Sequence, residues 1–195
     1  IKEGKDEEAA SKCQTLIGDK DAEALGSFQE FGEFQFDFLN TEEKNVFGYI
    51  RYLDLNTAST HVSYKYKTKK GVVLSFDREF FASYPDNVIC MKFSTTDKMT
   101  VNCRFLTPHN GRTTVELNQI TVEGELEDNQ MKFNGKLYIV PKDGKVKRKA
   151  NSILVEDATE IVMYASAATD YKNKYPLYRS GESTGEVNDR VQKII

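Results

Sequence analysis

The sequence predicts a mainly β protein: an antiparallel β-sandwich with a short helix before it and the start of a helix after it. Between Tyr49 and Phe105, apolar and polar residues alternate with a period of two, and β-branched and aromatic residues are common. Turn residues interrupt this alternation about every ten positions. Consecutive short strands joined by hairpins build a sandwich or a barrel, which is the basis of the predicted fold class.

The N-terminal segment favours a helix over Asp6–Ile17, because Ala9, Cys13 and Leu16 fall on one face. Gly18 fits a C-terminal cap of that helix. A second helical turn is compatible with the residues around Asp21–Leu25.

The first predicted strand covers Glu33–Leu39. Phe34, Phe36 and Phe38 alternate with polar residues, so they share one face of the strand. Phenylalanine is among the residues most often buried, and this face is expected to belong to the core.

Later strands are predicted from the same alternation, with turn signals between them. The expected strand ranges, by residue number, are 62–66, 72–81, 88–93, 99–105, 113–117, 120–126, 130–140, 152–155 and 160–168. Beyond them, Val187, Val191 and Ile194 share one face of an expected helix over Glu186–Ile195, which shows no capping signal at its end.

The cysteine count argues against a disulfide framework, because the chain has only three cysteines. We expect a hairpin with its loop at Thr96–Lys98, which would pair Met91 with Cys103 and place Cys90 on the opposite face, opposite Arg104. A shift of one residue would mix polar and apolar side chains on both faces. Cys90 and Cys103 are therefore predicted to be unbridged.

The bulk properties describe an ordinary globular chain. It has 195 residues, 39% of them hydrophobic and 29% charged, enough for one domain with a sizeable core. The formal net charge of −3 offers no basic field for nucleic acid. No apolar run approaches the ~20 residues of a membrane span.

Few residues point to chemistry. The two histidines, His61 and His109, lie in no spaced cluster with cysteine or acidic residues, so neither a metal site nor a cofactor is expected. No nucleophile elbow, P-loop or dinucleotide fingerprint is present. The polar cluster of Asp170, Tyr171 and Asn173, where a buried strand opens into a Tyr-rich loop, is the candidate carbohydrate-binding site. The alternative is a solvated loop without a ligand.

Three motifs together resemble the N-terminal domain of glycoside hydrolase family 95, the α-L-fucosidases, a domain of the glycosyl hydrolase family 65 N-terminal type. The central motifs are YIRYLDLNTA at 49–58, followed by Val62 and Tyr64, and REFFASYPDNVI at 78–89. The closing motif is AATDY at 167–171, and the helix at 7–18 with Ser27-Phe28-Gln29 is similar to the family's entry segment. The chain departs from the family at Glu30-Phe31, where the family has Pro-Leu, and in having no Trp.

The resemblance implies a β-sandwich domain over residues 1–185 and the beginning of a helical linker over 186–195. It implies a parent protein in which an (α/α)₆ barrel of the same chain carries the inverting catalytic carboxylate and acts on a fucosylated or galactosylated glycan. It also implies a periplasmic or secreted location for that parent. None of the family's catalytic residues has a counterpart in this chain, so we expect no catalytic residue here.

Three functions remain open at this point. The chain is a non-catalytic domain that packs on the catalytic barrel and shapes the glycan cleft, an independent carbohydrate-binding module, or a purely structural assembly domain. Titration with sugars separates the second from the first.

Overall fold

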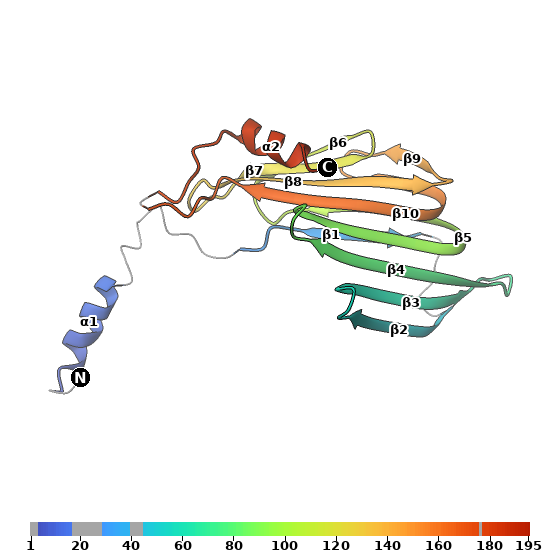
Figure 1. Cartoon of the computed structure of the whole chain (residues 1–195), viewed down its shortest axis with the longest axis horizontal. Coiled ribbons are helices and arrows are strands. Elements are labelled where there is room, and N and C mark those ends of the chain that lie inside the picture. The colour runs from blue at the N-terminus through green and yellow to red at the C-terminus, as the bar shows by residue number, and fades with distance from the viewer. Residues whose placement is uncertain (1–3, 17–28, 40–44, 176) are drawn as a thin grey trace.

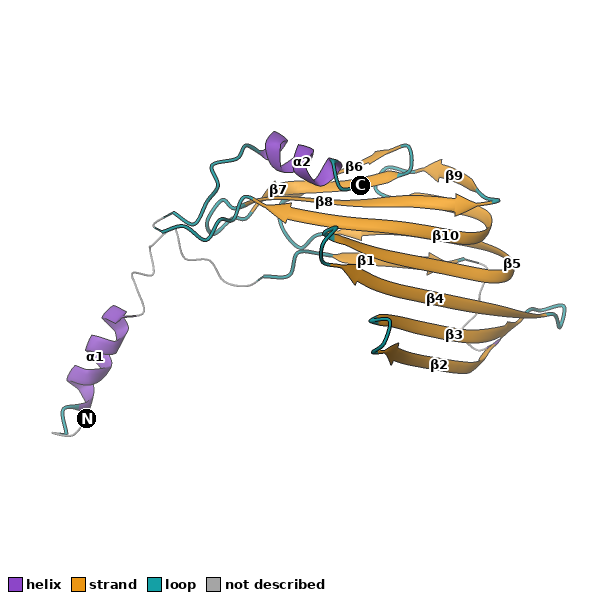
Figure 2. Cartoon of the chain, in the orientation of Figure 1, coloured by secondary structure: helices purple, strands orange, loops and turns teal. Residues whose placement is uncertain are grey.

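The computed structural model describes residues 4–16, 29–39, 45–175 and 177–195 (Figures 1 and 2). The elements of this part of the chain are, in order, α1 (Asp6–Leu16), β1 (Glu33–Phe38), β2 (Val46–Asp54), β3 (Ser59–Lys67), β4 (Val73–Ser83), β5 (Val88–Leu106), β6 (Gly111–Glu116), β7 (Gln119–Glu125), β8 (Lys132–Lys142), β9 (Lys145–Arg148), β10 (Ile153–Thr169) and α2 (Thr184–Gln192). The predicted cap at Gly18 and the turn at Asp21–Leu25 lie outside the described residues.

The described strands form one antiparallel sheet. Its main path runs β2-β3-β4-β5-β10-β8-β7-β6, while β1 pairs with β5 and β9 pairs with β10 off this path (Figure 1). The fold class predicted from the sequence is thus confirmed: the protein is mainly β and antiparallel, with one helix near each end.

The two layers of the sandwich share β5 and β10. The first half of β5, Val88–Thr95, pairs with β4, and its second half, Val101–Leu106, pairs with β1. Likewise β10 pairs with β9 through Ile153–Glu156 and with β8 from Glu160 onward. The layers are therefore portions of one sheet rather than two separate sheets.

Aromatic contacts show that β1 lies over the face of β4 and β5. The Phe36 and Phe93 rings meet edge to face with centroids 5.0 Å apart, and those of Phe38 and Phe76 lie 6.3 Å apart. The predicted stripe of Phe34, Phe36 and Phe38 packs against the core cluster. Because aromatic side chains remove large apolar areas from water, these contacts hold the two layers together.

A cation also lies within this aromatic group. The guanidinium carbon of Arg78, on β4, is 4.3 Å from the ring centroid of Phe38 and 5.5 Å from that of Phe93. Its Nη2 donates a hydrogen bond of 2.9 Å to the hydroxyl of Tyr64. Arg78 thus joins β1, β3, β4 and β5 through its planar face and one of its donors.

The hairpin predicted at Thr96–Lys98 is wrong. β5 runs without interruption from Val88 to Leu106, so Met91 pairs with Phe80 and Met163 rather than with Cys103. Cys90 lies opposite Phe81 and Tyr164 instead of Arg104. Thr96, Asp97 and Lys98 are exposed, and polar residues in a strand are compatible with pairing where their side chains reach water.

The two strands predicted at Ser152–Val155 and Glu160–Ala168 are one strand, β10, with an irregularity between them. Its register against β5 shifts between Val155 and Ala158 and again before Glu160, and Asp157 has a φ of 56°. A bulge of this kind inserts unpaired backbone and bends the strand. The polar break that resembled a turn is therefore a bulge where β10 changes partners from β9 to β8.

Helix α2 begins at Thr184, before the predicted start at Glu186, and ends at Gln192. Ser183 forms a capping box with Glu186, which satisfies free N–H groups at the first turn. The sequence shows no capping signal at the C-terminal end of this helix. In the structure Lys193 caps that end, and its N–H donates to the Asp189 carbonyl at 3.2 Å. Val187 and Val191 are fully buried, so α2 packs on the sandwich itself.

The bulge of β10 makes Gly144 sensitive to substitution. A side-chain carbon at this position would lie 2.9 Å from the Cβ of Ala158 and 3.0 Å from the carbonyl oxygen of Glu156. Gly144→Ala should therefore lower the free energy of unfolding by about 1–3 kcal/mol, as overpacking does. Gly185→Ala is the matched control, because its nearest neighbour is Ser183 Oγ at 3.9 Å. In helix α2 that change should stabilise by about 0.5–1 kcal/mol. Urea unfolding that ranks the two variants in the opposite order would contradict this description.

Cys90, which is partly buried, and Cys103, which is buried, are unbridged as predicted, and Cys13 is free and exposed. Burial, with a contribution from Asp37, raises the pKa of Cys103 to about 12, and burial followed by Asp86 raises the pKa of Cys90. Because the thiolate is the reactive form, iodoacetamide near neutral pH should label Cys13 first, Cys90 slowly and Cys103 only after denaturation. Peptide mapping by mass spectrometry measures the order; native labelling of Cys103 as fast as Cys13 would be inconsistent with it.

Candidate functional site

The first candidate surface is the loop of residues 170–180, between β10 and α2. Its two ends run side by side, since Tyr171 and Arg179 form an isolated antiparallel bridge and the Ser180 N–H donates to the Asp170 carbonyl at 2.8 Å. The Lys172 N–H donates to the Tyr178 carbonyl at 3.2 Å, one step further out. The loop is therefore a short hairpin-like projection from the end of the sheet.

Asp170 holds the base of this loop. Its side chain is only 3% exposed. The carboxylate Oδ1 accepts a hydrogen bond of 3.0 Å from the Lys132 N–H and lies 3.8 Å from Nε of Arg179. Arg179 in turn donates through Nη2 to the Asn129 carbonyl at 2.7 Å. Because a buried carboxylate needs such partners, Asp170 orders the start of β8 and both ends of the loop.

Tyr171 and Asn173 lie differently from Asp170. The Tyr171 side chain is 53% exposed, and Asn173 is exposed as well. Tyr175 and Leu177, further along, are 80% and 69% exposed. The structure thus places the three predicted residues in one loop, with Asp170 inside its base and the other two at its surface.

Helix α2 fixes the loop from the other side. Nη2 of Arg190 donates to the Thr169 carbonyl at 2.8 Å and pairs with Glu182 at 2.9 Å. Lys132 Nζ donates to the Glu182 carbonyl at 2.8 Å. The segment that follows the loop is therefore bound to both β8 and the end of β10.

A buried polar group lies beneath α2. Lys136 on β8 is only 3% exposed, and its Nζ donates to Oδ1 of Asn188 at 2.8 Å and to Oγ1 of Thr121 at 3.2 Å. Burial lowers the pKa of Lys136, opposed by the nearby carboxylates of Glu123, Glu116 and Asp189. These bonds fix the orientation of α2 on the sheet rather than forming an open site.

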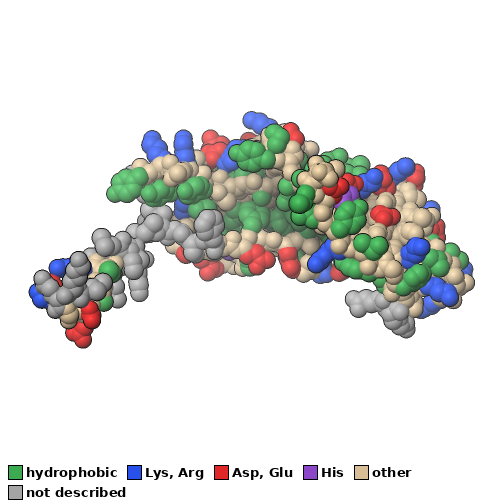
Figure 3. All heavy atoms as spheres, turned by 60° about the horizontal axis from the view of Figure 1, so that its bottom comes forward, with side chains coloured by type: hydrophobic (Ala, Val, Ile, Leu, Met, Phe, Trp, Pro, Cys, Tyr) green, Lys and Arg blue, Asp and Glu red, His purple; other side chains and the backbone are tan. Residues whose placement is uncertain are grey.

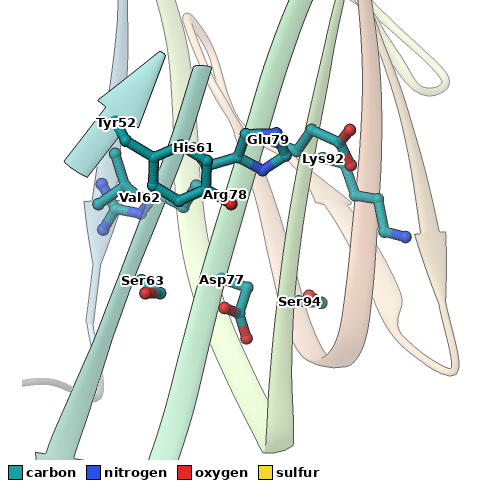
Figure 4. Close-up of a pocket in the computed structure, with 9 residues that line it drawn as sticks. All are labelled: Tyr52, His61, Val62, Ser63, Asp77, Arg78, Glu79, Lys92 and Ser94. Atoms are coloured by element: carbon teal, nitrogen blue, oxygen red, sulfur yellow. The ribbon is translucent and has the colours of Figure 1, made fainter. Parts of the chain in front are cut away.

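The second candidate surface was not identified from the sequence. It is a groove of about 260 Å³ on the outer face of β2–β5, lined among others by Tyr52, His61, Asp77, Glu79 and Lys92 (Figure 4). These residues come from four strands, so their proximity depends on the register between the strands. His61, which sequence reasoning treated as isolated, lies in this groove.

The described residues contain no group of three or more His, Cys, Asp or Glu side chains that could hold a metal ion. Hydrogen bonding to Ser180 lowers the pKa of the Glu182 carboxyl, and bonding to the Ser183 backbone lowers that of Glu186. Both shifts favour the charged carboxylate, whereas a general acid for glycoside hydrolysis needs a raised pKa.

No helix among the described residues has the length and apolar character needed to cross a membrane.

Comparison with known proteins relates the chain to glycoside hydrolases. Residues 1–174 match the glycosyl hydrolase family 65 N-terminal domain. The chain is 32% identical over 137 residues to alpha-L-fucosidase 2 of Arabidopsis thaliana. This alignment covers 68% of this chain and 15% of that protein. The chain thus spans a small part of this relative.

A solved structure shares the fold. A chain named as a kojibiose phosphorylase from the human microbiome superposes with a TM-score of 0.60 at 9% identity, over 84% of this chain and 25% of that one. At this identity the likeness concerns the fold alone.

The position of Asp170 predicts how the loop responds to mutation. Asp170→Ala leaves the Lys132 N–H and Arg179 without their shared acceptor and should destabilise the protein by about 1–3 kcal/mol. Amide hydrogen exchange should speed up at residues 171–180. Asn173→Ala is the control in the same loop and should change neither quantity. Unchanged exchange in the Asp170 variant would show that the loop does not depend on this carboxylate.

Proposed function

Because the chain belongs to the glycosyl hydrolase family 65 N-terminal domain family, we propose that it is the non-catalytic N-terminal domain of an α-L-fucosidase-like glycoside hydrolase. In this proposal, the domain packs on the catalytic barrel of the same polypeptide and contributes to its glycan cleft. The similarity to an α-L-fucosidase supports the choice of enzyme class. Helix α2 would begin the link to the barrel.

The observation that carries the packing role is an apolar core face left uncovered at β2. Leu53 lies in one cross-strand row with Thr60, Phe80 and the core residue Met91, yet Leu53 is 59% exposed. Tyr49, on the same face of β2, is 58% exposed. Figure 3, which turns the β2 edge toward the viewer, shows apolar side chains gathered in a hollow along the middle of the molecule.

An exposed apolar face on an edge strand favours association. We assign this face to packing against another part of the parent polypeptide. The loop of residues 170–180 would then contribute Tyr171 and Asn173 to the glycan cleft, while Asp170 positions them.

The packing role is tested with Leu53→Asp. In the isolated chain this exposed side chain contributes little to the core, so the melting temperature should stay within about 2 °C. In the full-length parent, the change should weaken domain packing by about 1.5–3 kcal/mol, the value of one buried leucine. Limited proteolysis between the domains measures it.

The control is Leu117→Asp, at an exposed position in the β6–β7 turn where φ is 47°. It should alter neither the isolated chain nor the parent. If the wild-type parent and the Leu53 variant resist the protease equally, β2 does not form part of the interface between the domains.

The activity is tested with an aryl fucoside. The isolated chain should show no turnover, and the full-length parent should hydrolyse the substrate. In the parent, Tyr171→Ala should raise KM or lower kcat, because a sugar ring would lose a stacking partner worth about 0.5–1.5 kcal/mol. Turnover by the isolated chain that survives repurification, and is lost on changing a carboxylate, would overturn the non-catalytic role. Unchanged kinetics in the Tyr171 variant would reduce the loop to a structural element.

A further inference from the structure

The groove on the outer face of β2–β5 has an arrangement that the proposed function does not use. Two cross-strand rows of side chains line it. In the first row Tyr52 pairs with His61, which pairs with Glu79, which pairs with Lys92.

The second row continues this pattern one step along the strands. Ser63 pairs with Asp77, and Asp77 pairs with Ser94. The residues between these positions, such as Tyr64, Phe76 and Phe93, are buried in the core, so both rows face outward.

One end of the groove is an ordered aromatic pair. The rings of Tyr52 and His61 stack with centroids 4.8 Å apart and an interplanar angle of 14°. Nε2 of His61 lies 2.7 Å from the Ser59 hydroxyl, which itself lies 2.7 Å from that of Thr57. Ser59 is only 3% exposed. The imidazole is therefore held from below, and Tyr52 is stacked on it with 52% of its surface exposed.

Most polar side chains beside this pair have no hydrogen-bond or ion-pair partner among the described residues. Asp77 and Glu79 form no side-chain hydrogen bond or ion pair with any residue that the structure describes, and the hydroxyls of Ser63 and Ser94 have no such partner there either. Lys92 at the far end is 3.2 Å from Glu160. Figure 4 shows Glu79 between the aromatic pair and Lys92, with Ser63, Asp77 and Ser94 in the row beside them.

We propose that this groove binds a neutral saccharide through one pyranose ring. The apolar face of the sugar would stack against Tyr52, its hydroxyls would donate to Asp77 and Glu79, and Lys92 and the two serines would complete the contacts. Because His61 lies between Tyr52 and Glu79 in the first row, the backbone positions of those two residues are about 10 Å apart, and one pyranose ring would lie between their exposed side chains. An anionic sugar is disfavoured, because the groove holds two unpaired carboxylates and its lysine already faces a third.

This site is separate from the loop of the proposed function. Lys92, the groove residue nearest the loop along this pairing, lies opposite Val162, seven residues before Thr169, where β10 ends. At ~3.3 Å per residue this separates the two surfaces by roughly 23 Å along the strand. The groove would thus hold a glycan away from the loop, and either surface can fail its test without the other.

The test is a ¹⁵N–¹H NMR titration of this chain with L-fucose, D-galactose and D-glucose, with sodium glucuronate as the anionic comparison. An open groove that stacks one ring should give a dissociation constant in the millimolar range. Amide signals of the residues in the two rows should shift with at least one neutral sugar, and much less with glucuronate.

Two variants test the contacts. Tyr52→Ala should weaken binding about tenfold through loss of stacking. Glu79→Gln should weaken it less, because a neutral amide accepts a weaker hydrogen bond than a carboxylate. Both positions face solvent, and retained dispersion of the spectrum shows that the variants fold.

Two controls separate the possible outcomes. Tyr84→Ala removes a tyrosine that is 92% exposed in the β4–β5 turn, outside the groove, and should leave the affinity unchanged. Tyr171→Ala should leave the groove shifts intact. Absence of groove shifts at saturating sugar, shifts confined to residues 170–180, or binding that survives Tyr52→Ala would each overturn the assignment.

Discussion

The antiparallel pairing of β5 with β10 is the constraint on which the rest of this structure depends. Each strand exchanges its outer partner midway: β5 passes from β4 to β1, and β10 passes from β9 to β8. The two strands therefore carry one hydrogen-bonded ladder through both layers. Met91 and Phe93 face the core before the exposed segment at Thr96–Lys98, and the odd-numbered residues from Met99 to Phe105 face it afterwards. One strand therefore supplies core residues to both layers.

This arrangement decides which surfaces stay open. Because β1 pairs only with the second half of β5, its phenylalanines cover β4 and β5 but leave the face of β2 exposed. The far end of β10 carries the loop held by Asp170, and α2 returns to pack over β8. The apolar face at β2 and the loop at 170–180 thus follow from how the long strands are paired.

The strands themselves could largely be predicted, because alternation of side chains reports which residues face the core. The Phe34–Phe38 stripe and the outward direction of Cys90 are examples. Continuity could not be predicted, since Thr96–Lys98 and the residues around Asp157 have the composition of turns yet lie inside strands. A polar tripeptide exposed along a bent strand has the same sequence pattern as a hairpin loop. Only the tertiary pairing distinguishes the two.

The candidate sites differ in the same respect. Asp170, Tyr171 and Asn173 are neighbours in sequence, so a loop after a buried strand was enough to select them. Tyr52, His61, Asp77 and Glu79 are brought together by two strand registers that no local pattern reveals. Groups carried on paired strands are held more precisely than groups on a loop, and the His61 ring is further fixed by the buried Ser59 hydroxyl. On these grounds the groove is the better preorganised of the two surfaces. The loop has an ordered base and exposed outer residues, and in our proposal a neighbouring domain completes its site.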